Sequence, residues 1–574
     1  MPKLKTLLQK HRADFVQWFV QIAVVFVVAA TSVPGVNESH YLTKAKHFFD
    51  PSFAPGDLFL ESGNSHYAST LLAGSLSLFM PLGAVAWVGR FLAWGLLSFA
   101  WIRFGQSLRI PRVLAPFVLA TWILAVDYGN WAGEWAVGGF EGKSLSYPCV
   151  LLGIAAVLQD RWERGWVWLA CGVLWHPLVG GWAGLSVGLL WLFSRSAPGF
   201  FSQMKWIAVA FAISLLGILP ALFGIRGDDP SAIAAQVHVF FRLDHHLRPT
   251  TFSETRNWAA CVSVTLFLIV AAAWIAAKHF AVSRGNPKGE ADEEELRLSL
   301  QGSGRLIAIA TFAALFAFIG WCIDHYIADS KAATHQPVLA ASLLRFYWLR
   351  WADIAVPLAW SAVLWQGVGF GFYRISEANG HADDENRVLL ARARKVGIAL
   401  LAPTVLCLSA FRNYQGSDDT VPPADKLVVE TFGERRKIEW TDGRSNRYID
   451  WLAVCEWIRE KTPTDSLWLT PKYQQSFKWH AERAEVVCWK DVPQDVSSVI
   501  EWYRRVKVLT PRVTPSGLVR GWTDEEIIEL KEEFGFEYVL IDRTYHAKHE
   551  QPPGFELVYP INVVNRSFAV FRIR

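Results

Sequence analysis

Residues 15–31, FVQWFVQIAVVFVVAAT, form an apolar run, and the polar stretch Asn37-Glu38-Ser39-His40-Tyr41 follows it closely. The run lacks a small-residue cleavage pattern before the polar stretch, so we expect a retained membrane helix rather than a removed signal peptide. Basic residues precede the run, and neutral or acidic residues follow it as far as Lys44. Because basic residues collect on the cytoplasmic side, this asymmetry predicts a cytoplasmic amino terminus and an extracytoplasmic Glu38.

The composition is that of a membrane protein. Of the 574 residues, 52% are hydrophobic and 19% are charged, and the mean hydropathy is +0.21. A soluble chain of this length carries more charge and fewer long apolar runs. The net charge is only +4 and the basic residues are spread over short loops, so we expect no nucleic-acid partner.

The apolar runs predict an α-helical polytopic membrane bundle of about eleven transmembrane helices, followed by a small α/β soluble domain. An odd number of spans places residues 412–574 outside the cytoplasm and makes residues 1–411 the transmembrane domain. The expected spans are 15–32, 80–102, 113–130, 144–159, 165–176, 178–194, 206–224, 257–278, 305–326, 350–371 and 395–411. Residues 67–80 are apolar but short, and they predict an interfacial helix.

After residue 411 the sequence mixes polar and apolar residues. Apolar positions at helical spacing predict a helix over residues 448–461, and short β-type runs predict strands near 466–469, 485–489 and 537–541. This alternation is typical of an α/β domain. Cys455 and Cys488 lie in it, and an oxidising location would allow them to form a disulfide.

Three polar clusters fall at the predicted outer ends of the spans. The first follows span one and contains Glu38, His40 and Tyr41, whereas the second, with Glu141 and Lys143, opens the fourth span. The third is the hairpin Leu174-Trp175-His176-Pro177-Leu178. Loop carboxylates are usually solvated, and an acidic residue at a helix start is often a cap. Three clusters at one end of a bundle nevertheless predict one shared site.

With these motifs, the chain resembles the polytopic glycosyltransferases of the GT-C superfamily, in particular protein mannosyltransferases and lipid A aminoarabinose transferases. In that group an acidic residue, often with a Tyr three residues later, follows span one, as Glu38 and Tyr41 do here. A second acidic residue opens the fourth span, as Glu141 does. The sequence departs from the pattern at Asn37, where an acid is usual, and at His176, where a Lys is usual.

A closer similarity exists to an uncharacterised bacterial membrane family known only as a domain of unknown function. Residues 41–61 and the stretch Tyr347-Trp348-Leu349-Arg350 carry it. It implies no activity.

The GT-C resemblance implies transfer of a sugar from a polyprenyl-phosphate donor to an extracytoplasmic acceptor, which is a glycan, lipid or protein. It implies a multi-pass protein of the bacterial cytoplasmic membrane, with no cofactor. We expect Glu38 to act as the base that takes the acceptor proton, with Glu141 sharing that catalytic role. The substrate-binding candidates, which include cations for the phosphate, are His40, Tyr41, Lys143, His176, Arg345 and Arg350.

Three alternatives remain at this point. The first is a catalytically inactive envelope scaffold with a binding domain, which Asn37 favours. The second is a transporter, although such proteins usually carry inverted repeats and ionisable groups at mid-membrane. The third is a divalent metal site, because one cluster has suitable residue types. Adjacent histidines on a helix point in different directions, which is unfavourable for binding one metal ion. That cluster is His238, Arg242, Asp244, His245, His246 and Arg248.

Overall fold

The computed structural model describes most of the chain. The described residues are 2–35, 37–223, 230–284, 290–328, 336–378, 444–509, 524–542, 554–561 and 564–573. The predicted span at 395–411 and the predicted domain boundary at 411 lie outside these residues, so both stay predictions.

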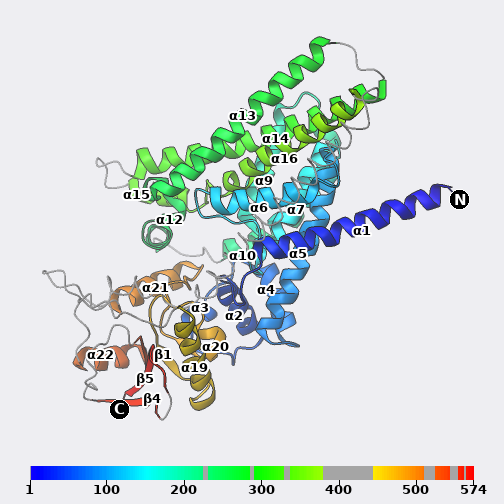
Figure 1. Cartoon of the computed structure of the whole chain (residues 1–574). Coiled ribbons are helices and arrows are strands. Elements are labelled where there is room, and N and C mark those ends of the chain that lie inside the picture. The colour runs from blue at the N-terminus through cyan, green and yellow to red at the C-terminus, as the bar shows by residue number, and fades with distance from the viewer. Residues whose placement is uncertain are drawn as a thin grey trace.

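The described residues before 379 form helices joined by loops (Figure 1). The α-helices begin with α1 (Pro2–Ala29), α2 (Glu38–Phe49), α3 (Leu58–Glu61), α4 (Tyr67–Ser77), α5 (Leu82–Ser107), α6 (Ala115–Gly129), α7 (Gly142–Leu158), α8 (Trp162–Trp175) and α9 (Pro177–Phe193). They continue with α10 (Phe200–Phe223), α11 (Pro230–Gln236), α12 (Asp244–Leu247), α13 (Glu254–Arg284), α14 (Glu290–Cys322), α15 (Gln336–Leu344) and α16 (Arg350–Ala378). Two π-helical segments, η1 (Val237–Arg242) and η3 (Ile323–Ala328), and the 3-10 turn η2 (Pro249–Thr251) interrupt them.

Five of the described helices are long and apolar enough, by length and composition, to cross a membrane. They are Arg12–Ala29, Leu82–Ser107, Phe200–Pro220, Glu254–His279 and Arg297–Ala328. Three shorter apolar helices are Ala115–Gly129, Gly142–Leu158 and Pro177–Phe193. A helix lies at each of the first ten predicted spans, and α4 lies at the predicted interfacial helix. The count of about eleven spans is not confirmed, because several of these helices are shorter than a bilayer requires.

The helical core holds the His176 hairpin in place. Helix α7 packs against α5 and α8, and α8 turns directly into α9 at His176. Pro177 begins α9, where its missing N–H costs no helical hydrogen bond. Gly180 permits the close approach of the two helices, since a Cβ there would lie 2.1 Å from the Val173 backbone nitrogen. The His176 hairpin is therefore a tight, packed turn, as the sequence predicts.

The carboxy-terminal region contains a five-stranded sheet in the order β2-β1-β3-β5-β4. Strand β1 is parallel to β2 and β3, whereas β5 pairs antiparallel with β3 and β4. The strands are β1 (Leu467–Leu469), β2 (Ala484–Glu485), β3 (Tyr538–Asp542), β4 (Phe555–Tyr559) and β5 (Phe568–Ile573). The helices are α19 (Arg444–Lys461), α20 (Phe477–Ala481), α21 (Val496–Val508) and α22 (Asp524–Phe534).

This region confirms most of the predicted elements. Helix α19 and strands β1 and β3 lie where the sequence predicts them, but β2 is only two residues long and begins one residue earlier. Residues 486–489 are not part of a strand, although the Val486 backbone nitrogen still donates to the Trp468 carbonyl of β1 at 2.9 Å. Strands β4 and β5 were not predicted. Cys455 and Cys488 are both buried free thiols, so the disulfide is not formed.

The carboxy-terminal region docks onto the elements that follow the first helix (Figure 1). Helix α20 contacts α2, and α21 contacts α3, α11 and η1. Asp57 begins α3 by accepting hydrogen bonds from the backbone nitrogens of Phe59 and Leu60, both at 3.0 Å. Its other oxygen accepts a hydrogen bond from the Glu485 backbone at 3.2 Å. The Asp57 carboxylate therefore caps α3 and also joins the helical part to the carboxy-terminal region.

Candidate functional site

A cavity of about 910 Å³ lies between the helical part and the carboxy-terminal region. Its walls come from the start of α2, the loop before α7, the α8–α9 hairpin, η1, the segment before α16, and residues 490–499 of the carboxy-terminal region. Residues spread over most of the chain therefore meet in one space.

Seven of the eight residues predicted for the site line this cavity. They are His40, Tyr41, Glu141, Lys143, His176, Arg345 and Arg350. The prediction was that Glu38, Glu141, His176 and Arg350 share one cavity, and the structure brings the last three of them together. The eighth residue, Glu38, does not line the cavity.

Glu38 is a fully paired, buried carboxylate. Its side chain is 0% exposed, and the Arg90 guanidinium binds both of its oxygens at 2.6 Å. The backbone nitrogens of Gly35 and Phe140 donate to the two oxygens at 2.7 and 2.8 Å. A carboxylate offers about four acceptor sites, and here all four are filled. The surroundings of Glu38 support a structural role rather than the predicted role of base.

Glu141 has the opposite surroundings. It is 5% exposed, its Oε1 lies 3.4 Å from the Lys143 ammonium, and its Oε2 accepts no hydrogen bond within the described residues. Burial raises the pKa of Glu141, and Glu134 adds to the rise, while Lys143 and Asn37 oppose it. A carboxylate with a raised pKa and a free oxygen is a better proton acceptor than a solvated one.

Glu134 holds the cations of the site in place and was not predicted. Its Oε1 accepts hydrogen bonds from Lys143 Nζ at 2.8 Å and from the Tyr147 hydroxyl at 3.1 Å, and its Oε2 lies 2.7 Å from Arg350 Nε. Burial by itself raises the pKa of Glu134. The charges of Arg350 and Lys143 lower that pKa by more than burial raises it, so it lies below its usual range. Glu134 is therefore an ionised group that orients Lys143 and Arg350.

The histidines of the cavity are neutral at neutral pH. Burial lowers the pKa of His66 and of His238 to about 4, and that of His246 to about 3. Burial also holds the pKa of His176 well below its usual range. The expectation that His176 supplies a cation for phosphate is therefore corrected: it offers a neutral imidazole, whose Nδ1 accepts a hydrogen bond from the Val179 backbone at 3.3 Å.

Three other cations face the cavity, and none has a carboxylate within 4 Å among the described residues: Arg242, Arg345 and Lys490. Arg242 donates from Nε to the Trp489 carbonyl at 2.7 Å. Burial and the nearby Arg242 lower the pKa of Lys490 to about 8, so its ammonium is still charged at neutral pH. The cavity thus presents cationic groups that an anionic ligand can neutralise.

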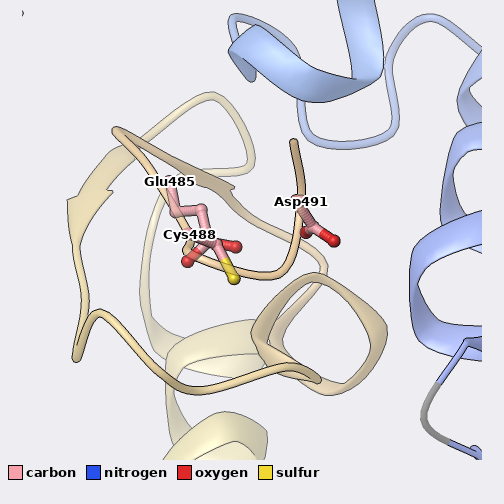
Figure 2. A group of neighbouring side chains, drawn as sticks. All are labelled: Glu485, Cys488 and Asp491. Atoms are coloured by element: carbon pink, nitrogen blue, oxygen red, sulfur yellow. The ribbon is translucent and has the colours of Figure 1, made fainter. Parts of the chain in front are cut away.

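The cluster that was considered for a metal divides in the structure. His238, Arg242 and His246 line the cavity, whereas His245 pairs with its neighbour Asp244 at 3.3 Å. Within the described residues, three metal-ligating side chains come together only at Glu485, Cys488 and Asp491 (Figure 2). The Lys478 ammonium lies 2.6 Å from both carboxylates of that group and supplies its positive charge.

Sequence reasoning missed Glu134, Arg242 as a cavity residue, Lys490 and the Arg90 partner of Glu38. Arg90 carried one usable signal, since a charged residue inside a predicted span requires a buried partner. Glu134 and Lys490 lie in loops that resemble solvated ones, Arg242 ends η1, and only the fold of the chain brings the three to the cavity.

The helices and this cavity define a membrane-type helical protein with a polar site between its helical part and a small α/β region. A family described as "Domain of unknown function (DUF6798)" matches residues 449–509. No curated protein matches the chain.

Among solved structures, the oligosaccharyltransferase of Archaeoglobus fulgidus in the apo form is similar at 13% identity and a TM-score of 0.42, with 92% of this chain and 69% of that chain covered. Archaeal oligosaccharyltransferase AglB from the same organism, in complex with an inhibitory peptide and a dolichol-phosphate, gives 13% identity and a TM-score of 0.42, with 93% and 70% covered. Similarity of this degree does not define the activity of this chain.

Proposed function

We propose that the chain is a membrane glycosyltransferase that transfers a sugar from a polyprenyl-phosphate donor to a hydroxyl acceptor outside the cytoplasm. The observation that supports this proposal most is the juxtaposition in one cavity of the Glu141 carboxylate and several cations. Among the described residues, Glu141 Oε2 accepts no hydrogen bond and Arg242, Arg345 and Lys490 have no carboxylate within 4 Å. Glycosyl transfer needs both a proton acceptor and groups that stabilise the departing phosphate.

In the proposed reaction the acceptor oxygen forms a bond to the anomeric carbon as its proton passes to Glu141. The bond from that carbon to the phosphate oxygen breaks, and the polyprenyl phosphate leaves with the electron pair. Arg242, Arg345 and Lys490 stabilise the charge that develops on the phosphate. Glu134 binds Lys143 and Arg350, and Lys143 lies beside Glu141, which orients the reacting groups.

The proposal places the protein in the bacterial cytoplasmic membrane, with the amino terminus in the cytoplasm and the cavity outside. A reporter that is active only outside the cytoplasm, fused after Arg574, is expected to be active. Activity only from a fusion within residues 285–289 would invert this topology.

The test of activity is the release of polyprenyl phosphate from a labelled polyprenyl-phosphate-sugar by the purified protein in detergent. Glu141→Gln keeps the size of the side chain but removes the base, so we expect a loss of about 100-fold or more. Glu254→Gln, at the exposed start of α13, is the matched control and is expected to retain the rate.

If Glu141→Gln released polyprenyl phosphate at the wild-type rate, the catalytic role of Glu141 would be refuted. Absence of release from the wild type, with a folded protein that still binds the lipid, would instead favour the inactive scaffold.

A further inference from the structure

An imidazole–carboxylate pair crosses the junction between the helical part and the carboxy-terminal region. His40 Nδ1 in the first turn of α2 lies 2.7 Å from Asp491 Oδ1, although 451 residues separate the two in the chain. Both side chains are buried, with exposures of 9% and 5%. The pair is thus a buried contact within the folded chain rather than a contact between exposed side chains.

Asp491 is fixed and ionised in this pair. Its other oxygen, Oδ2, lies 2.6 Å from the Lys478 ammonium, which also contacts Glu485 at 2.6 Å and Asp57 at 3.3 Å. Burial alone raises the pKa of Asp491, but Lys478 and the hydrogen bond from His40 outweigh it and hold the pKa well below its usual range. An ionised carboxylate can only accept hydrogen bonds.

This property of Asp491 fixes the tautomer of His40. Because the carboxylate is an acceptor, Nδ1 must carry the proton and donate it to the hydrogen bond. Burial lowers the pKa of His40 even though Asp491 opposes this effect, so the ring is neutral and Nε2 keeps its lone pair.

The ring is also fixed in position beside the cavity. It packs on Phe59 with ring centroids 4.2 Å apart, and it meets Tyr41 edge-on at 4.7 Å. His40 lines the cavity, and its Nε2 has no hydrogen-bond partner among the described residues. The cavity therefore receives a hydrogen-bond acceptor whose orientation is set from outside the helical part.

We infer that His40 Nε2 binds a hydroxyl group of the sugar substrate, and that Asp491 is the residue of the carboxy-terminal region that positions it. This inference rests on the proposed function, because it assigns a sugar-binding contact within the same cavity. It also makes the carboxy-terminal region a part of the substrate site rather than a separate binding module. The chemical class that the pair recognises is a hydroxyl donor, in contrast to the phosphate that the cations would hold.

The first experiment reads the tautomer directly and does not need turnover. The protein labelled with ¹⁵N-histidine is examined in detergent by NMR, and the His40 signal is assigned by its disappearance in His40→Asn. We expect the proton on Nδ1 in the wild type and a loss of that preference in Asp491→Asn. A wild-type proton on Nε2 would overturn the inference.

The second experiment tests the ligand with glucose 1-phosphate and, separately, inorganic phosphate as probes. We expect glucose 1-phosphate to shift the His40 Nε2 signal and inorganic phosphate to leave it unchanged, since only the former carries sugar hydroxyls. No shift with either probe, or the same shift with both, would contradict hydroxyl binding. This result is independent of whether the donor is turned over, so it separates failure here from failure of the proposed activity.

Variants sharpen the assignment. His40→Asn keeps an N–H donor for Asp491 but lacks Nε2, so we expect about tenfold weaker use of the sugar donor with unchanged thermal stability. Asp491→Asn is expected to raise KM more than it lowers kcat. Glu482→Gln alters an exposed contact with Lys46 across the same junction, at 3.8 Å, and is expected to leave KM and the His40 signal unchanged. Wild-type KM in His40→Asn would refute the role of Nε2.

Discussion

Glu38 begins α2 and Glu141 lies directly before α7, and they show how differently two buried carboxylates can be used. Glu38 meets one guanidinium and two backbone nitrogens, so its capacity for hydrogen bonds is filled. Glu141 lines the cavity, its Oε2 is buried without a hydrogen bond among the described residues, and the Lys143 ammonium lies 3.4 Å from its Oε1. A filled carboxylate stabilises the fold, whereas an unfilled one beside a cavity is available to a ligand.

We expect the largest effect on stability when the ion pair between Arg90 and Glu38 is broken. Arg90→Met leaves Glu38 buried without its cation, so we expect the free energy of unfolding to fall by about 3–5 kcal/mol. Thermal unfolding in detergent measures this change. Glu141→Gln is the comparison, and we expect its stability to stay within about 0.5 kcal/mol of the wild type. Equal stability of Arg90→Met and the wild type would show that the Glu38 pair is not structural.

The next effect concerns the cations that lack a carboxylate partner. Lys490→Met and Arg242→Met each remove one charge-assisted contact, worth about 1.5–3 kcal/mol, to an anionic donor. We expect the KM of the labelled donor to rise about tenfold or more in both variants. Thermal stability should change little in Lys490→Met but fall in Arg242→Met, which also loses the hydrogen bond to the Trp489 carbonyl. An unchanged KM in both variants would contradict the assignment of Lys490 and Arg242 to phosphate binding.

The two sides of the site also predict a pH profile. Glu141 must be ionised to accept a proton, and its pKa is raised, so turnover is expected to fall as the pH drops through a value above 4.5. Lys490 loses its charge as the pH rises through about 8, so donor binding is expected to weaken there. The rate measured from pH 4 to 10 should be bell-shaped, and Lys490→Met should lose its alkaline limb. A flat profile would contradict both assignments.

The smallest effect is expected at the exposed rim of the junction. Lys46→Met removes a contact with Glu482 between half-exposed side chains, and such pairs contribute about 0–1 kcal/mol. We expect a change in the free energy of unfolding below about 0.5 kcal/mol and normal turnover. A larger loss would show that the docked regions depend on their rim as well as on the buried Asp491 and Lys478.

The sequence predicted the positions of many elements but not their pairings. Apolar periodicity indicates α5, α7 and the His176 hairpin because membrane and core burial require it locally. The same local pattern does not reveal that Arg90 reaches Glu38, because that contact depends on how two helices pack. The exposed-looking loop residues Glu134 and Lys490 reach the site only through tertiary structure, so no spacing in the sequence could have assigned them.

The order in which the parts of the site are synthesised follows from the His40–Asp491 contact. His40 leaves the ribosome early and Asp491 very late, so the cavity wall stays incomplete until the carboxy-terminal region has folded and returned to α2. Contacts between such distant segments form slowly, because a very long loop must close. During synthesis the helices therefore exist for a period without a finished site. A chain arrested before residue 478 would lack Lys478, Glu485 and Asp491, so Asp57 would be without the lysine that it contacts.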